Sequence, residues 1–240
     1  MQLPPLLAGT LIKRYKRFLA DIKLDTQEII TAHCPNSGSL TGLANEGVKV
    51  YVSKNMNPKN KLAYKLELIE TSKQALVDIN TSRTNHLVKE ALMLKQIPEL
   101  AQYNTIKPET KFLNSRLDFQ LSNTKRSCVV EVKSVTLQRN PLIAEFPDAI
   151  TTRGIKHLQD LITIKQSGIH AVNLYIIQRN DEHKFFRIAK DIDKNYFNTF
   201  MKAKECGVEL LCYTCDVSTT KITIKHKVQI SYGDTNKKLL

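Results

Sequence analysis

The sequence has no tryptophan, few glycines and prolines, and no long apolar run. Its 240 residues contain 8 Gly and 8 Pro, and aromatic side chains make up only 7%. The longest apolar stretch, 171–177, has the length of a strand and is far shorter than the roughly 20 residues of a membrane-spanning helix. At the N-terminus the apolar residues precede the basic ones, which is the reverse of the order in a secretory signal. We therefore expect no membrane segment and a cytoplasmic location.

Cysteine is also scarce, and its number is odd. Five cysteines fit reduced thiols better than a disulfide framework. Cys212 and Cys215 form a lone CxxC inside 208–217, a segment with the pattern of a strand. A zinc or redox site would need a second pair, or a helix beginning at the motif. We therefore expect these two thiols to be buried and unreactive.

Acidic residues are too few to balance the basic ones. The 36 Lys and Arg outnumber the 23 Asp and Glu, so the net charge is +13 and the pI is about 9.5. A compact protein with this charge repels itself, which favours a polyanionic partner, nucleic acid before an anionic membrane surface. The alternative is a solvated, lysine-rich surface. The hydrophobic content of 42% excludes a disordered chain.

The first third of the chain has the pattern of a small β-barrel. Runs in which Val, Ile, Tyr and Leu alternate with polar residues are separated by Gly, Asn, Pro and Ser. They predict five strands, at 16–24, 27–34, 48–52, 62–70 and 75–79. Five short strands in so short a segment indicate an OB-like barrel over residues 1–82, a fold that often binds nucleic acid across one face.

From about residue 83 the periodicity changes to that of a mixed α/β domain. Apolar residues at helical spacing predict helices at 85–96, 152–166 and 193–206. Strands are expected at 104–106, 115–121, 128–137, 171–178, 208–215 and 221–230, and a loop at 139–149. The second domain is thus predicted to span 83–232, with a loose tail at 233–240.

Two adjacent strands carry a pattern of carboxylates and a lysine. Asp118 lies in the first, and Glu131 and Lys133 share one face of the second. If these strands pair, the three side chains meet. Mg²⁺ or Mn²⁺ takes carboxylate oxygens plus water and phosphate, and would polarise a phosphoryl oxygen while Lys133 stabilises developing charge. The alternative is the ordinary polar face of a half-buried strand.

The order of these elements adds to the pattern. A helix, a strand, the Asp118 strand, the Glu131-x-Lys133 strand, a helix and a strand resemble the core of PD-(D/E)xK nucleases. Leu117 stands where the motif's name has Pro, which is not a ligand. Glu90, at the edge of the first helix's apolar stripe, is a candidate further metal-site carboxylate. Gln178 follows the next strand, where some members carry a helper polar residue.

Three polar clusters are candidates for nucleic-acid binding. The first places four cations in five residues, a phosphate-contacting edge or a charge-protected strand: Lys13, Arg14, Lys16 and Arg17. Asn36 and Ser37 belong to a segment rich in turn formers, which can present amide and hydroxyl groups to phosphate or be only a turn. The third cluster begins the helix at 152 and forms an anion site or a solvated helix face: Arg153, Lys156 and His157.

Taken together, these segments resemble the sugar fermentation stimulation protein A (SfsA) family. The matching stretches are 12–21, 33–39, 80–81, 85–92, 115–119, 130–133 and 146–158. The resemblance implies an OB-like domain, a PD-(D/E)xK nuclease-like domain, a prokaryotic cytoplasm and binding of DNA with little sequence preference. It also implies a link to regulation of sugar, notably maltose, utilisation genes. The implied metal-site positions are Glu90, Asp118, Glu131 and Lys133. Whether the protein cleaves nucleic acid is left open.

Overall fold

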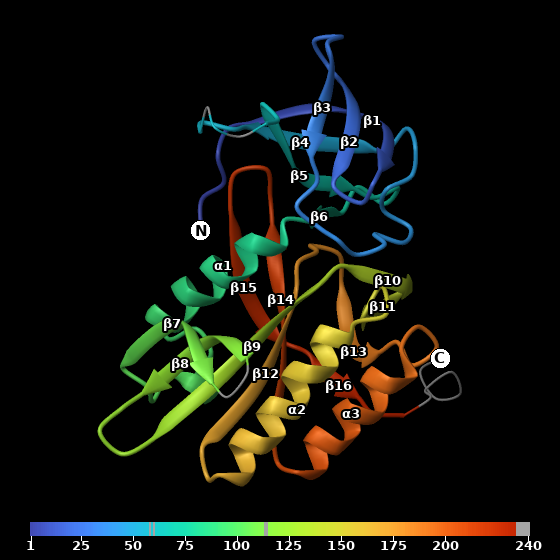
Figure 1. The fold of residues 1–240 in the computed structure, drawn as a ribbon. Helices are drawn as coiled ribbons and strands as arrows, with labels where there is room; N and C mark the ends of the chain where they lie inside the picture. Colours follow the sequence, from blue (N-terminus) through green and yellow to red (C-terminus); the bar gives the residue numbers. More distant parts are fainter. Residues whose placement is uncertain (58, 60, 113–114, 234–240) are drawn as a thin grey trace.

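The computed structural model describes residues 1–57, 59, 61–112 and 115–233 (Figure 1). A barrel formed by the N-terminal strands stands on one end of a larger α/β domain. The fold is therefore mixed α/β, as predicted. The predicted loose tail lies, from residue 234 on, outside the described residues.

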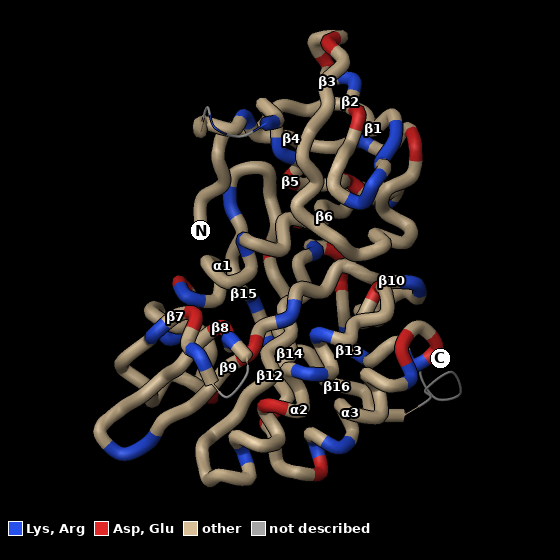
Figure 2. The backbone as a smooth tube through the Cα atoms, in the orientation of Figure 1, with Lys and Arg blue, Asp and Glu red and all other residues tan. Residues whose placement is uncertain are grey.

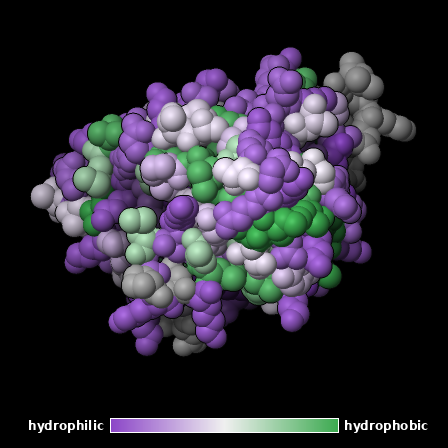
Figure 3. Space-filling view, turned by 90° about the horizontal axis from the view of Figure 1, so that it is seen from above, coloured by the Kyte–Doolittle hydropathy of each residue, from purple (hydrophilic) through white to green (hydrophobic). Residues whose placement is uncertain are grey.

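The barrel is built from short strands whose inward side chains are apolar. The strands are β1 (Leu6–Tyr15), β2 (Leu19–Leu24), β3 (Ile29–His33), β4 (Lys49–Lys54), β5 (Tyr64–Glu70) and β6 (Leu76–Asp78). They run in the order β3-β2-β1-β4-β5-β6, and pairing of β3 with β5 closes the first five into the predicted OB-type barrel. Leu11, Ile22 and Val50 are fully buried inside it. Seen from this end, the surface is mostly hydrophilic with scattered apolar patches (Figure 3).

A six-stranded sheet forms the centre of the second domain. Its order is β15-β14-β12-β9-β8-β7. The helix α1 covers one face and the helices α2 and α3 cover the other, each over its own apolar core. The bounds are α1 (Thr81–Met93), η1 (Pro98–Leu100), β7 (Thr105–Phe112), β8 (Ser115–Ser122), β9 (Ser127–Val135), α2 (Thr152–Gln166), β12 (His170–Ile177), α3 (Lys194–Glu205), β14 (Glu209–Val217) and β15 (Ile222–Lys227).

The prediction of a loop at 139–149 is wrong. The segment contains β10 (Leu137–Asn140) and β11 (Leu142–Phe146), which form a second sheet with β13 (His183–Ile188) and β16 (Gln229–Ser231). Ile143 and Ala144 of β11 are buried, and Ala144 belongs to the core under α2 and α3. The predicted strands also leave out β1, because its first seven residues, LLAGTLI, are mostly apolar and show no alternation.

The two domains share a buried polar network. Arg83 of α1 donates to Asp78 at 2.7 Å and to Glu67 of the barrel. Asp78 also accepts from Nε2 of Gln178 at 2.7 Å, so the barrel is joined to the end of β12. The N-terminal residues, predicted with the barrel, lie on the second domain instead, where Gln2 pairs with Lys221.

The predicted burial of the two CxxC thiols is present in the structure. Cys212 and Cys215 are buried, and burial raises the pKa of both thiols above the ordinary value. The described cysteines are all free. Within the described ranges, no helix combines the length and the apolar character needed to cross a bilayer.

Candidate active site between the domains

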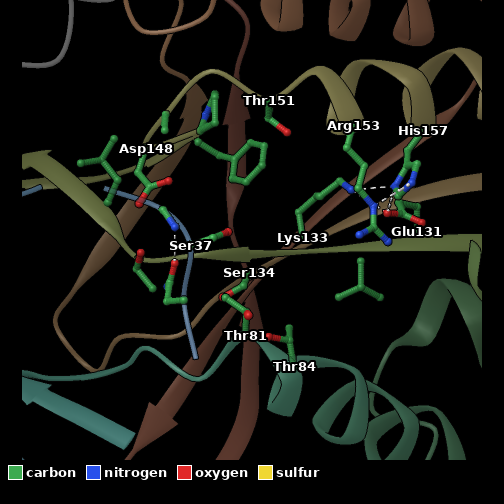
Figure 4. A pocket seen from close by; sticks show the side chains of 18 of the residues that line it. Ser37, Thr81, Thr84, Glu131, Lys133, Ser134, Asp148, Thr151, Arg153 and His157 are labelled. Carbon is green, nitrogen blue, oxygen red and sulfur yellow. Dashed lines mark hydrogen bonds and ion pairs between the residues drawn. The ribbon is translucent and has the colours of Figure 1, made fainter. Parts of the chain in front are cut away.

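A pocket of about 370 Å³ lies where the barrel meets the α/β domain (Figure 4). Its walls come from both domains. The barrel contributes the turn after β1 and residues 36–38 of the loop 35–40, and the second domain contributes the start of α1, strands β8 and β9, residues 145–151 and the first turns of α2. Asp118, Glu131 and Lys133 all line it. The predicted convergence of these three side chains is therefore present in the structure.

The Asp118 carboxylate is held in place by two donors. Its Oδ2 accepts from the backbone N–H of Val132 at 2.8 Å, and its Oδ1 accepts from Nδ2 of Asn85 at 2.6 Å. Burial and the nearby negative charge of Glu131 raise the pKa of Asp118 to about 6. Two carboxylates that repel one another in a partly desolvated pocket form a site in which a cation is favoured.

Glu131 is almost fully buried, with 2% of its surface exposed. Its Oε1 accepts from Nζ of Lys133 at 2.6 Å, and Nδ1 of His157 lies against the same oxygen. Burial alone would raise the pKa of Glu131, but Lys133 and His157 outweigh burial and hold this pKa below its ordinary value. Its Oε2 is buried and has no hydrogen-bond partner among the described residues.

The unpartnered Oε2 fits a divalent cation. A buried carboxylate oxygen without a donor is costly, and a metal ion would satisfy it. In the part of the chain that the structure describes, no group of three or more His, Cys, Asp or Glu is placed to hold a metal. The remaining ligands of a cation beside Asp118 and Glu131 would be oxygens of water, phosphate or backbone carbonyl groups, which hard cations commonly use.

Glu90 does not reach this pair. Its carboxylate lies 2.8 Å from the amino group of Met1 and does not line the pocket. Residues five apart on a helix point about 140° away from each other, so when Asn85 faces Asp118, Glu90 faces elsewhere. The side chain of α1 that contacts Asp118 is therefore Asn85, a residue that the sequence pattern did not single out.

Gln178 lies behind the pocket and does not line it. It is fully buried, and its Oε1 accepts from Thr84 at 2.7 Å and from Ser134. Because Thr84 and Ser134 both line the pocket, Gln178 fixes two wall residues rather than contacting a ligand.

The three residues predicted at the start of α2 take different positions. His157 is 5% exposed and lines the pocket, with its Nδ1 against Oε1 of Glu131. Arg153 is exposed at the rim, with its Nε 3.4 Å from Nε2 of His157. Lys156 is exposed and does not line the pocket. The helix is capped by Thr151, whose hydroxyl oxygen accepts from the N–H of Gly154.

The basic cluster of the barrel surrounds the turn between β1 and β2, where positive charge is visible in Figure 2. Arg17 lines the pocket, and Lys16 beside it is exposed. Lys13 lies 3.6 Å from Asp21 and over the ring of Tyr15. Of these cations, Arg17 is the one at the pocket itself.

Arg14 supports the barrel loop rather than the solvent-facing surface. Its guanidinium donates to the backbone carbonyls of Asn36 at 2.9 Å, Gly38 at 2.8 Å and Ser39 at 3.1 Å. Asn36 is buried, and its Oδ1 accepts from the N–H of Gly38 at 2.8 Å. Ser37 is exposed and lines the pocket, so it is the member of this loop best placed to meet a ligand.

Comparisons with known proteins match both halves of the chain. Residues 12–79 match the description "SfsA N-terminal OB domain", and residues 82–221 match "Sugar fermentation stimulation protein RE domain". A sugar fermentation stimulation protein homolog from Pelagibacter ubique is 46% identical over 226 residues, which cover 94% of this chain and 96% of the relative. One from Nitrosococcus oceani is 46% identical over 229 residues, covering 94% and 97%.

A solved structure agrees with the architecture. The Pyrococcus furiosus SfsA in complex with Ca²⁺ superimposes with a TM-score of 0.88 at 24% identity, covering 96% of this chain and 98% of the other. At that identity the likeness concerns the fold: an OB barrel followed by a restriction-endonuclease-like α/β domain.

Proposed function

The chain belongs to the sugar fermentation stimulation protein (SfsA) family, and from this premise we propose that it binds nucleic acid and hydrolyses phosphodiester bonds with a divalent metal ion. The observation that carries the proposal is the buried, unpartnered Oε2 of Glu131, in the pocket that Asp118 and Lys133 also line. Hydrolysis is the chemistry for which two carboxylates, a cation and an ammonium group are suited.

Asp118 and Glu131 would hold the metal, which supplies Lewis acidity to a phosphoryl oxygen when bound. Mg²⁺ and Mn²⁺ are the ions proposed, and the Ca²⁺ in the Pyrococcus furiosus structure supports a hard, oxygen-seeking cation. Glu90 is left out of the proposed site because its carboxylate pairs with Met1.

The remaining residues have separate roles in the proposal. Lys133 donates to Glu131 at 2.6 Å and keeps further protons for a phosphate oxygen, where it would offset developing negative charge. His157 fixes the orientation of Glu131. Arg17 and Arg153, from the two domains, would bind phosphates on either side of the pocket.

The partner we propose is DNA, bound with little sequence preference. The net charge of +13 and the cations around the turn after β1 supply attraction to any phosphate backbone. We place the protein in the reducing cytoplasm, which its free cysteines fit. The link to regulation of sugar, notably maltose, genes stays a prediction from the family resemblance.

Cleavage tests the proposed hydrolysis. Purified protein is incubated with labelled DNA and RNA in EDTA, Mg²⁺, Mn²⁺ or Ca²⁺, and the products are separated on a denaturing gel. We expect cleavage of DNA in Mg²⁺ or Mn²⁺ that EDTA abolishes and added metal restores. Absence of cleavage in every metal, or cleavage that persists in EDTA, would contradict the proposal.

Salt dependence tests the binding surface. Affinity for duplex should fall with a log–log slope of about −0.9 for each phosphate neutralised. In the double variant Lys16→Ala/Arg17→Ala, we expect weaker binding and a slope that is shallower by about 0.9 per lost contact, measured by fluorescence anisotropy in EDTA. Lys13→Ala is the comparison within the same cluster, and it should change the slope less, because Lys13 pairs with Asp21 and does not line the pocket. An unchanged slope in the double variant would place the DNA elsewhere.

A further inference from the structure

We propose that this pocket admits a single nucleic-acid strand, or a strand end separated from its partner, and excludes intact duplex. The inference rests on the proposed function and specifies its substrate class. It follows from how the barrel loop 35–40 is attached, from how deeply the carboxylates lie, and from the residues exposed at the rim.

The barrel loop forms one wall of the pocket and is tied to the second domain at both ends. At one end, the N–H and the hydroxyl of Thr81 both donate to the carbonyl of Pro35, at 3.4 and 3.0 Å. At the other, the backbone N–H of Leu40 donates to Oδ2 of Asp148 at 3.1 Å, and the hydroxyl of Ser39 donates to the carbonyl of Asp148 at 2.5 Å. The loop 35–40 is therefore fixed at both ends to the second domain, and we call it the bridge.

Close contact at Gly38 strengthens the second attachment. A Cβ added at Gly38 would collide with both carboxylate oxygens of Asp148. Arg14 holds the same loop from the barrel side, through the carbonyls of Asn36, Gly38 and Ser39. Figure 4 shows Ser37 and Asp148 together on one side of the pocket, and Glu131, Lys133 and His157 on the other. Opening this wall would break contacts to both domains.

The metal-binding oxygens lie too deep for a rigid duplex. The side chain of Glu131 is 3% exposed, and a pocket of about 370 Å³ is near the lower end of the roughly 300–1,000 Å³ of small-ligand sites. That volume suits a ligand-sized segment of a strand. A duplex holds its phosphates on a stiff helix. With the bridge in place, we infer that the backbone of a duplex cannot reach Glu131, whereas a flexible single strand can.

The rim offers apolar surface that paired bases cannot use. Ile150, which lines the pocket near Arg153, is 76% exposed; Phe18, which follows Arg17 in the chain without lining the pocket, is 48% exposed. Aromatic and apolar side chains beside cations are what unstacked bases bind, because every base has a π-face. In a duplex these faces are already stacked. Both apolar residues therefore favour a strand with free bases.

Photocrosslinking tests strand access without relying on cleavage. Single strands of about 20 nucleotides with 4-thiothymidine, and blunt duplexes of the same sequence, are irradiated with the protein in EDTA at saturating concentrations, and the crosslinked peptides are mapped by mass spectrometry. Separating bases costs a few kcal/mol, so crosslinks to 35–38 and 147–151 should be at least about tenfold more abundant with the single strand. Equal crosslinking of the blunt duplex at these residues would overturn the inference.

Opening the bridge gives a second test. Asp148→Ala removes the bond to Leu40, and Gly38→Ala displaces the Asp148 carboxylate from the same loop by steric conflict. Each should raise the ratio of duplex to single-strand crosslinking at the pocket at least severalfold. Asp148→Asn is the matched control, since it removes the charge but still accepts from Leu40, and should leave the ratio near that of the wild type. An unchanged ratio in both opened variants would overturn the inference.

The two proposals can fail separately. Crosslinking that prefers the single strand, without cleavage in any metal, would contradict the proposed hydrolysis. It would still support the proposal that the pocket admits a single strand and excludes intact duplex. Metal-dependent cleavage of intact blunt duplex at the rate of single strands would support hydrolysis and contradict the exclusion of duplex from the pocket.

Discussion

Replacing Asp118 by Asn is expected to remove metal-dependent cleavage. The amide keeps the shape of the side chain and can still accept from Val132, but it cannot supply the negative charge that attracts a divalent cation. Charge stabilisation by a bound metal is worth several kcal/mol, so the rate should fall by a factor on the order of 10³ or more. The measurement is initial cleavage rate in saturating Mn²⁺.

The same variant separates a lost metal site from a lost fold. In the wild type without metal, burial and Glu131 raise the pKa of Asp118 to about 6. The neutral amide of Asp118→Asn removes the repulsion from Glu131, so the variant should not have lower thermal stability in the absence of metal. In the wild type, metal at 100 times its Kd should add about 2.7 kcal/mol to the free energy of unfolding, and this gain should vanish in the variant. Glu109→Gln, at an exposed carboxylate, is the control. Full cleavage activity in Asp118→Asn would remove this residue from the proposed site.

Replacing Arg83 by Met is expected to destabilise the protein by about 3–5 kcal/mol. The Arg83 side chain is 8% exposed and pairs with Glu67 and Asp78, which are 2% and 0% exposed. Methionine fills the space but leaves two carboxylates buried without a cation. Urea unfolding followed by circular dichroism measures the loss.

The loss should also depend on pH. Burial raises the pKa of Asp78 to about 7, and Arg83 is the largest factor that lowers it, so without Arg83 this pKa rises further. An acid whose pKa is higher in the folded state takes up a proton on folding, and stability then falls as pH increases toward that pKa. The deficit of Arg83→Met should therefore be larger at pH 8 than at pH 5.

An exposed pair provides the matched control for Arg83. Arg116 pairs with Glu109, and the two side chains are 68% and 63% exposed. Arg116→Met should change stability by less than about 1 kcal/mol. Equal losses in the two variants would mean that the interdomain network contributes no more than a surface ion pair.

Much of the fold could be predicted from the sequence because its periodicities are strong. The helix at 152–166 is found at its predicted residues. The helix predicted at 85–96 begins earlier, at Thr81, because its first turn packs polar rather than apolar side chains: Arg83 and Thr84 are buried in hydrogen bonds. No apolar stripe marks such a turn. The second sheet was missed for a similar reason, since its short strands carry charges that pair only in the folded state, such as Arg139 with Glu145.

The candidate site could be predicted in part. Alternation puts Asp118 on one face of β8 and puts Glu131 and Lys133 together on one face of β9, and antiparallel pairing of the two strands then brings these side chains together. The direction in which a helix side chain points depends on how the helix is rotated against the sheet, and therefore Glu90 was included and Asn85 omitted. The burial of His157 and the interior position of Gln178 depend on packing between distant segments, which one sequence does not encode locally.

The hydrogen bonds of the Gln178 side chain have a consequence for how the protein unfolds. Its side chain joins Asp78 of the barrel, Thr84 of α1 and Ser134 of β9, while its own backbone directly follows β12. Unfolding of either domain would therefore break hydrogen bonds of Gln178 that also hold segments of the other domain. The two domains should unfold in a single cooperative transition. A chain cleaved between β6 and α1 would give two fragments, each with charged groups of the interdomain network that have lost their partners.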